Sequence, residues 1–206
     1  LQREEFPPFK IEVQPQIPIF PDVAREKIHV QYALIPPYAY ANIFWDEANK
    51  ELIYFLQEPE LTEEEQKTHV ILEEGIKELT NISYIAVKKG DTVIEYLEKN
   101  IKILINELKL KVSADSYLKI MYYIYRNFVG LNEIEPLMWD YYIEDVECNG
   151  IDVPIYVVHR KYRNLKTNIV FKDAKKLANF VEKLAQKTGH YISYADPLLD
   201  ASLPDG

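Results

Sequence analysis

The sequence predicts an α+β fold: a helical N-terminal domain with an extended arm and a β-hairpin, followed by a small α/β domain with an antiparallel sheet. Three observations predict this class. Seven prolines between residues 1 and 37 exclude a regular helix there. Apolar side chains then repeat at helical spacing as far as Phe128. Residues 142–171 form short β-prone runs separated by turn residues.

The composition places limits on the kind of protein and on its partners. With 206 residues, 48% of them hydrophobic, the chain can bury one good core or two small ones. A net charge of −9 disfavours attraction to phosphate backbones, so we expect no nucleic-acid partner. No apolar run approaches the roughly 20 residues that span a bilayer, so we expect no direct membrane insertion. Cys148 is the only cysteine, which favours a reducing cytoplasm, and the four histidines are too scattered for a metal site.

Residues 1–58 read as a Pro-rich extended arm with short edge strands, followed by a β-hairpin. Two β-prone runs, residues 38–45 and 51–57, flank the polar connector DEANK. We expect these two runs to be the strands of the hairpin.

Residues 59–140 read as a helical domain. Thr62 and Glu65 form a capping-box pattern, which predicts a helix start near Thr62. Residues 91–110 and 114–128 each carry one apolar stripe, with Ser113 or Asp115 as a possible cap of the later helix. Each of the three helices must therefore bury one face against a neighbour.

Residues 141–206 read as a small α/β domain with an antiparallel sheet. The runs 142–148, 153–159 and 165–171 predict a three-stranded antiparallel meander with a turn at Asn149-Gly150. Asp173 can cap the helix that follows, and Gly189 can end it.

Most clusters of charged residues have an ordinary structural interpretation. Glu63 to Glu65 fit the positive end of a helix dipole better than a metal or acid–base site. Asp196 and Asp200 flank Pro197 and are better explained as turn residues than as a cation site. Neither a GxSxG nucleophile elbow nor a GxxxxGK[ST] phosphate loop is present, so the residues alone show no complete catalytic site.

His159, Arg160 and Lys161 form a cationic group at the end of an expected strand. From such a position the side chains can reach an anion held by a neighbouring element. The alternative is an edge-strand tip whose charges keep the sheet soluble and block pairing with another chain. The residues alone leave both interpretations open.

Residues 130–206 carry a set of motifs that together resemble a known family. The set comprises EPL at residues 135–137, Asp140, IEDV at 143–146, Asn149-Gly150, the strand 156–159, TNIVF at 167–171 and DASLPDG at 200–206. It resembles the region before the nucleotide-binding core in archaeal members of the type II/type IV secretion ATPase superfamily, which includes pilus-assembly and archaellum motor ATPases. The chain departs from the family at Asn132-Glu133, where Gly-Pro is usual, and at Arg163, where glycine is common.

The resemblance implies a cytoplasmic, hexameric ring ATPase that powers filament assembly or protein secretion through a membrane platform protein. ATP and Mg²⁺ would bind to the full-length protein, and neither would bind to this part alone. Arg160 and Lys161 would come near the nucleotide when the ring closes, and Asp205 and Gly206 would shape the hinge.

The turn at residues 204–206 and the first residue, Leu1, lead us to expect the N-terminal part of a longer protein. Without its phosphate loop we expect this part to be inactive. The alternative is a noncatalytic adaptor or regulatory module built on the same domain. The downstream reading frame discriminates the two, because the ATPase must continue into GxxxxGK[ST].

Overall fold

A computed structural model describes residues 6–11, 17–79 and 90–190 of the chain. The contacts divide the chain into two compact units, each of which combines segments that are distant in the sequence. The expected three-part division at residues 58/59 and 140/141 stays a prediction. Unit 1 comprises Leu1–Gln14, Ala33–Tyr40 and Gln57–Gly130, and unit 2 comprises Pro15–Tyr32, Ala41–Leu56 and Leu131–Gly206.

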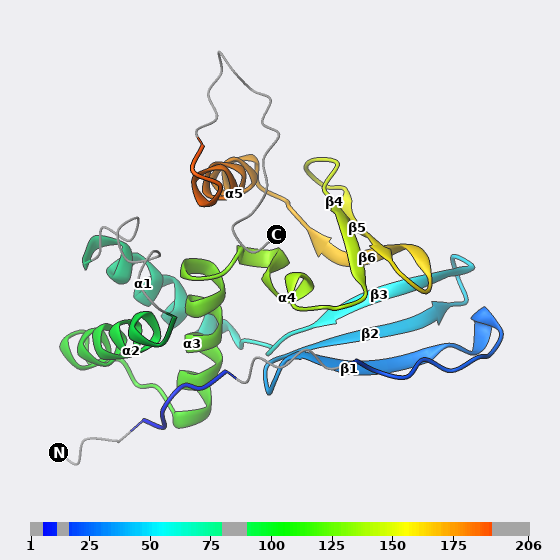
Figure 1. Cartoon of the computed structure of the whole chain (residues 1–206). Helices are drawn as coiled ribbons and strands as arrows, with labels where there is room; N and C mark the ends of the chain where they lie inside the picture. Colours follow the sequence, from blue (N-terminus) through cyan, green and yellow to red (C-terminus); the bar gives the residue numbers. More distant parts are fainter. Residues whose placement is uncertain (1–5, 12–16, 80–89, 191–206) are drawn as a thin grey trace. The chain divides into compact units, whose positions relative to one another are not determined.

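Three long helices form most of unit 1 (Figure 1). They are α1 (Glu63–Leu79), α2 (Gly90–Glu107) and α3 (Ala114–Phe128). The capping box is confirmed, because the Thr62 N–H donates to Glu65 Oε2 at 2.8 Å and the Glu65 N–H donates to Thr62 Oγ1 at 3.2 Å. The Ser113 hydroxyl accepts from the Ser116 N–H and so caps α3.

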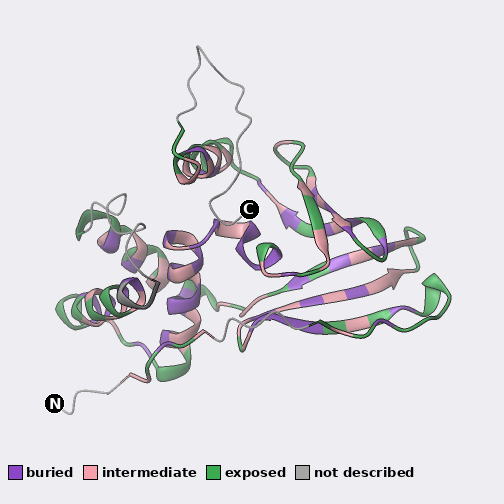
Figure 2. Cartoon of the chain, viewed as in Figure 1, coloured by how far each residue is buried: buried purple, intermediate pink, exposed green. Residues whose placement is uncertain are grey.

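The buried stripes of the three helices meet in one core (Figure 2). α1 and α2 approach closely at Gly75, where an added Cβ would lie 2.9 Å from Leu104 Cδ1. The core of unit 1 includes Leu72, Ile76, Leu97, Ile101, Leu104, Tyr117, Ile120, Met121, Tyr122 and Ile124.

A six-stranded sheet runs in the order β1-β2-β3-β6-β5-β4. Its strands are β1 (His29–Ile35), β2 (Ala39–Asp46), β3 (Glu51–Gln57), β4 (Ile143–Glu147), β5 (Pro154–His159) and β6 (Arg163–Val170). The expected hairpin strands, β2 and β3, are neighbours, and the expected meander β4-β5-β6 is antiparallel. The arm contributes the edge strand β1, in keeping with the edge strands expected there.

β3 and β6 join the hairpin and the meander into a single sheet, a feature that the sequence did not indicate. These two strands pair in parallel, with Ile53 opposite Lys166 and Tyr54 opposite Thr167. The pairing places the inward-facing residues of both halves on one side of the sheet. Among them, Ile43, Tyr54, Ile155 and Val157 are completely buried.

Short elements complete the described chain. η1 (Arg25–Lys27), η3 (Asn132–Ile134) and α4 (Glu135–Met138) are single turns, and α5 (Ala174–Lys187) follows the sheet. Asp173 caps α5 as expected, because its Oδ1 accepts from the N–H groups of Lys175 and Lys176.

The two positions at which the sequence resemblance leads us to expect glycine adopt a left-handed backbone. Asn132 has a φ of 51° and Arg163 a φ of 65°. Asparagine tolerates this region better than most residues, whereas arginine is strained in it. Both turns therefore have a backbone that glycine adopts more readily than the residue present.

Candidate functional site

The candidate site in unit 2 is the turn between β5 and β6, which carries His159, Arg160 and Lys161. His159 is the last residue of β5 and is completely buried. Its Nδ1 accepts the backbone N–H groups of Lys161 and Tyr162, both at 3.2 Å. Burial, with a smaller contribution from the Lys161 charge, lowers the pKa of His159 to about 4. The ring is therefore neutral at pH 7, and because Nδ1 is an acceptor, Nε2 carries the proton.

Arg160 lies at the tip of the turn and is half-exposed. Its Nε lies 3.8 Å from Glu144 Oε1, and its guanidinium stacks 4.5 Å from the centre of the Tyr141 ring. An exposed ion pair of this length contributes little to stability. The guanidinium can therefore reach an incoming anion at low cost.

Lys161 is engaged by the arm. Its Nζ donates to the carbonyl oxygens of Phe20 at 3.2 Å and Pro21 at 3.4 Å, and it lies 5.6 Å from the centre of the Phe20 ring. Arg160 and Lys161 are neighbours on one turn, but their contacts differ: Arg160 meets Glu144 and Tyr141, whereas Lys161 meets the arm. The arm therefore engages two of the three N–H groups of Lys161.

The Phe20 ring inserts into an aromatic socket, which we define as Tyr32, Tyr142, His159 and Tyr162. The ring centres lie 4.6 to 5.8 Å from that of Phe20, and all four rings are nearly perpendicular to it. Edge-to-face geometry of this kind is the favoured arrangement of aromatic pairs. The socket thus holds the arm against the β5–β6 turn.

Asp140 forms a second polar cluster in unit 2. Its Oδ2 accepts hydrogen bonds from Tyr32 at 2.5 Å and Tyr54 at 2.7 Å, and its Oδ1 accepts the Tyr142 N–H at 2.8 Å. Burial raises the pKa of Asp140, and it also raises the pKa of each of the two tyrosines. The cluster fixes β1, β3 and the start of β4 to one carboxylate, which is a structural role.

Unit 1 has a comparable buried cluster around Glu58. Arg126 Nη1 lies 2.8 Å from both carboxylate oxygens, and the Tyr122 hydroxyl donates to Glu58 Oε1 at 2.6 Å. Arg126 also lies over the Tyr123 ring, whose pKa is raised to about 12 chiefly by burial. These contacts attach the segment before α1 to α3.

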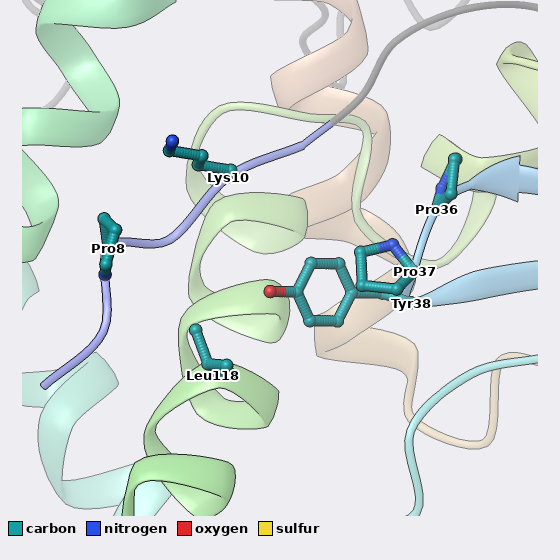
Figure 3. A pocket seen from close by; sticks show the side chains of 6 residues that line it. All are labelled: Pro8, Lys10, Pro36, Pro37, Tyr38 and Leu118. Atoms are coloured by element: carbon teal, nitrogen blue, oxygen red, sulfur yellow. The ribbon is translucent and has the colours of Figure 1, made fainter.

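A cavity of about 310 Å³ lies in unit 1 beside the first part of the arm (Figure 3). Phe6 stacks on Tyr117 with ring centres 4.5 Å apart, and the Phe9 N–H donates to Glu98 Oε1 at 2.8 Å. The lining is mainly apolar, and Lys10 supplies its only full charge. It consists of Pro8, Lys10, Pro36, Pro37, Tyr38 and Leu118.

The structure describes only some of the other site residues that the sequence analysis considered. Asp196, Asp200, Asp205 and Gly206 lie outside the described residues. Glu63 to Glu65 form the first turn of α1, as the structural interpretation expected. Phe20, Tyr32 and Tyr162 were missed, and the only available signal was the aromatic content of the arm and turns.

Two properties of the described residues bear on the kind of site. No described group of three or more His, Cys, Asp or Glu side chains could hold a metal ion. Within the same residues, every helix is too short or too polar to cross a bilayer.

No protein-family model matches the chain. The chain is similar to three uncharacterized proteins of Methanocaldococcus jannaschii. It is 36% identical to MJ1288 over 164 residues, which are 80% of this chain and 65% of that protein. It is 35% identical to MJ0900 over 98 residues and 34% identical to MJ0781 over 127 residues, which are 18% and 17% of those proteins. The chain therefore spans less than two thirds of each of these relatives.

Proposed function

We propose that the chain is the N-terminal region of a hexameric ATPase that couples ATP hydrolysis to filament assembly or protein secretion. The protein would be cytoplasmic and would reach the membrane through a platform protein. The observation that carries the proposal is the motif set of residues 130–206. The motifs that lie in the described residues fall on consecutive elements of the chain, from α4 through β4, β5 and β6.

The lengths of two relatives support the proposal that this region is joined to further domains. The matched segments occupy less than a fifth of MJ0900 and MJ0781. In those proteins the region is a minor part of a much longer chain, as the proposal requires of an N-terminal region before a motor core.

In this function the β5–β6 turn contributes positive charge to the phosphates when the ring closes. Arg160 is suited to this role because its guanidinium is half-exposed and its ion pair with Glu144 is long. Lys161 is less suited, because the arm engages two of its three N–H groups. ATP and Mg²⁺ would be held by the core that follows, where their chemistry is phosphoryl transfer to water.

The test compares Mg-ATP hydrolysis by this chain with hydrolysis by the longest protein that the gene encodes. We expect activity and a hexamer only in the longer protein. Arg160→Ala should lower its kcat by at least about tenfold with an unchanged oligomeric state, as loss of a transition-state cation does. Lys172→Ala, at an exposed lysine outside the turn, is the matched control. Full activity of the Arg160→Ala ring would contradict the assigned role.

A noncatalytic adaptor or regulatory module is the second candidate, and the length of MJ1288 favours it. The match covers 65% of that relative, which leaves room for little more than one small further domain. Absence of ATP hydrolysis in the longest encoded protein, with the protein folded, would select this candidate.

A further inference from the structure

The aromatic socket has the features of a peptide-binding site that the chain fills with its own arm. One anchor, Phe20, enters the socket, while the main chain on both sides is held by hydrogen bonds. Tyr142 donates to the Pro18 carbonyl at 3.1 Å, and Lys161 donates to the carbonyls of Phe20 and Pro21. An inserted side chain combined with hydrogen bonds to the main chain is a common mode of peptide recognition.

Two large apolar side chains close to Phe20 in the arm are exposed. Ile19 is 97% exposed and Ile17 is 60% exposed, although both are large and apolar. Pro15, Pro18 and Pro21 recur every third residue, which is the period of a polyproline II helix. Such a segment is extended before it binds, and little entropy is lost when it docks.

The socket has polar groups that Phe20 does not use. His159 Nε2 and the Tyr162 hydroxyl are buried and have no hydrogen-bond partner among the described residues. The two side chains are 0% and 7% exposed, and their rings stack with centres 5.1 Å apart beside Phe20. Because His159 Nδ1 accepts from the turn, Nε2 is a donor of fixed orientation. A phenyl ring cannot pair with either group.

From these observations we infer that the socket is an exchangeable site for an extended, proline-containing segment of a partner protein. The anchor of that segment is a tyrosine followed by proline. Its hydroxyl supplies an acceptor for His159 Nε2 and a partner for the Tyr162 hydroxyl, neither of which Phe20 provides. The arm of this chain is a weaker occupant that covers the site until the partner arrives. The inference is independent of ATP hydrolysis, so it can fail or succeed separately from the proposed function.

The experiment measures fluorescence anisotropy of labelled peptides with the sequence of residues 15–24, PQIPIFPDVA. Three peptides carry Phe, Tyr or Ala at the anchor position. The protein is the full chain with Phe20→Ala, which removes its own anchor, beside the wild type and Phe20→Leu. Circular dichroism establishes that each variant is folded.

We expect the Phe20→Ala protein to bind the Tyr peptide about fivefold more tightly than it binds the Phe peptide. This is the change in Kd that one net hydrogen bond produces. The Ala peptide should not saturate. The wild type should bind the Tyr peptide about a hundredfold more weakly, because its own arm competes at high effective concentration. A Phe20→Ala, Tyr162→Phe protein should lose much of the preference for Tyr, and Lys172→Ala should not change it.

Three results would overturn the inference. The first is no saturable binding of the Phe or Tyr peptide to a folded Phe20→Ala protein. The second is equal or tighter binding of the Phe peptide, which removes the role of the unused polar groups. The third is failure of both Phe20→Ala and Phe20→Leu to fold, since Phe20 would then be an integral part of the core.

Discussion

The Tyr54 hydroxyl donates a 2.7 Å hydrogen bond to Asp140 Oδ2, and this tyrosine is completely buried. The bond joins the centre of β3 to the segment between α4 and β4. Because Tyr32 donates to the same oxygen, the loss of the carboxylate would leave two buried hydroxyls without that acceptor.

We therefore predict that Asp140→Ala lowers the free energy of unfolding by about 3 kcal/mol, and that Tyr54→Phe lowers it by about 2 kcal/mol. Urea denaturation followed by circular dichroism measures both. Asp145→Ala, at an exposed carboxylate on β4, should change stability by less than about 0.5 kcal/mol. Equal effects of Asp140→Ala and Asp145→Ala would show that the buried cluster contributes nothing.

The buried pair of Glu58 and Arg126 in unit 1 gives a prediction about coupling. Arg126→Met should cost about 3 kcal/mol, because it leaves a largely buried carboxylate without its cation. Glu58→Gln combined with Arg126→Met should cost less than Arg126→Met alone, since the uncompensated charge is gone while the amide oxygen can still accept from Tyr122. A double-mutant cycle from urea denaturation measures the coupling. Simple additivity of the two changes would contradict the expected coupling.

His159 predicts a loss of stability in mild acid. The unfolded chain, in which the pKa is near its ordinary value of 6.5, takes up the proton first as the pH falls, whereas the folded chain resists protonation until about pH 4. The contribution of neutral His159 is therefore complete above pH 6.5 and is lost between about pH 6.5 and 4. It amounts to about 3 kcal/mol at most. Asp140 acts in the opposite direction, because its raised pKa lets the folded state bind a proton more readily than the unfolded state.

Urea denaturation at a series of pH values checks this prediction. His159→Gln should flatten the pH dependence of the unfolding free energy between pH 6.5 and 4, whatever it does to stability at pH 7. His190→Gln, at an exposed histidine, should leave the slope as in the wild type. The same steep slope in His159→Gln would assign the effect to other groups.

Gly75 gives a prediction whose size depends on a second residue. Alanine is about 1 kcal/mol better than glycine inside a helix. In the wild type its Cβ would lie 2.9 Å and 3.1 Å from the two methyl carbons of buried Leu104, so Leu104 must shift and the gain is offset. We expect Gly75→Ala to be nearly neutral in the wild type and to stabilise a Leu104→Ala protein by about 1 kcal/mol. Thermal unfolding of the four proteins measures this, and an equal gain in both backgrounds would show that the helices are not in tight contact.

The parts of the fold that sequence predicted are those set by near neighbours. Thr62 and Glu65 are three residues apart, and Asp173 caps through the next few N–H groups, so the pattern itself contains both partners. The apolar stripes of α2 and α3 follow in the same way from helical spacing.

The parts that the sequence did not predict depend on contacts between residues that are distant in the sequence. The alternation around Tyr54 identifies a strand, but nothing in it indicates that Thr167 will lie opposite. The anion contact of Lys161 stays a prediction, and the acceptors that Lys161 meets here are carbonyls of residues 20 and 21. Backbone carbonyls are common to every residue, so no pattern of side chains could have identified these two.

The parallel contact between β3 and β6 has a consequence for synthesis on the ribosome. β3 ends at Gln57, and the strand that must lie beside it begins only at Arg163, after all three long helices have been made. Pairing between such distant segments is slow, whereas helices form from local contacts. We expect the helices to fold first, while the edge of β3 is still unpaired. Nascent chains associate with one another through unpaired strand edges of this kind. A ribosome that pauses before residue 163 should therefore increase aggregation of this protein more than one that pauses after residue 170.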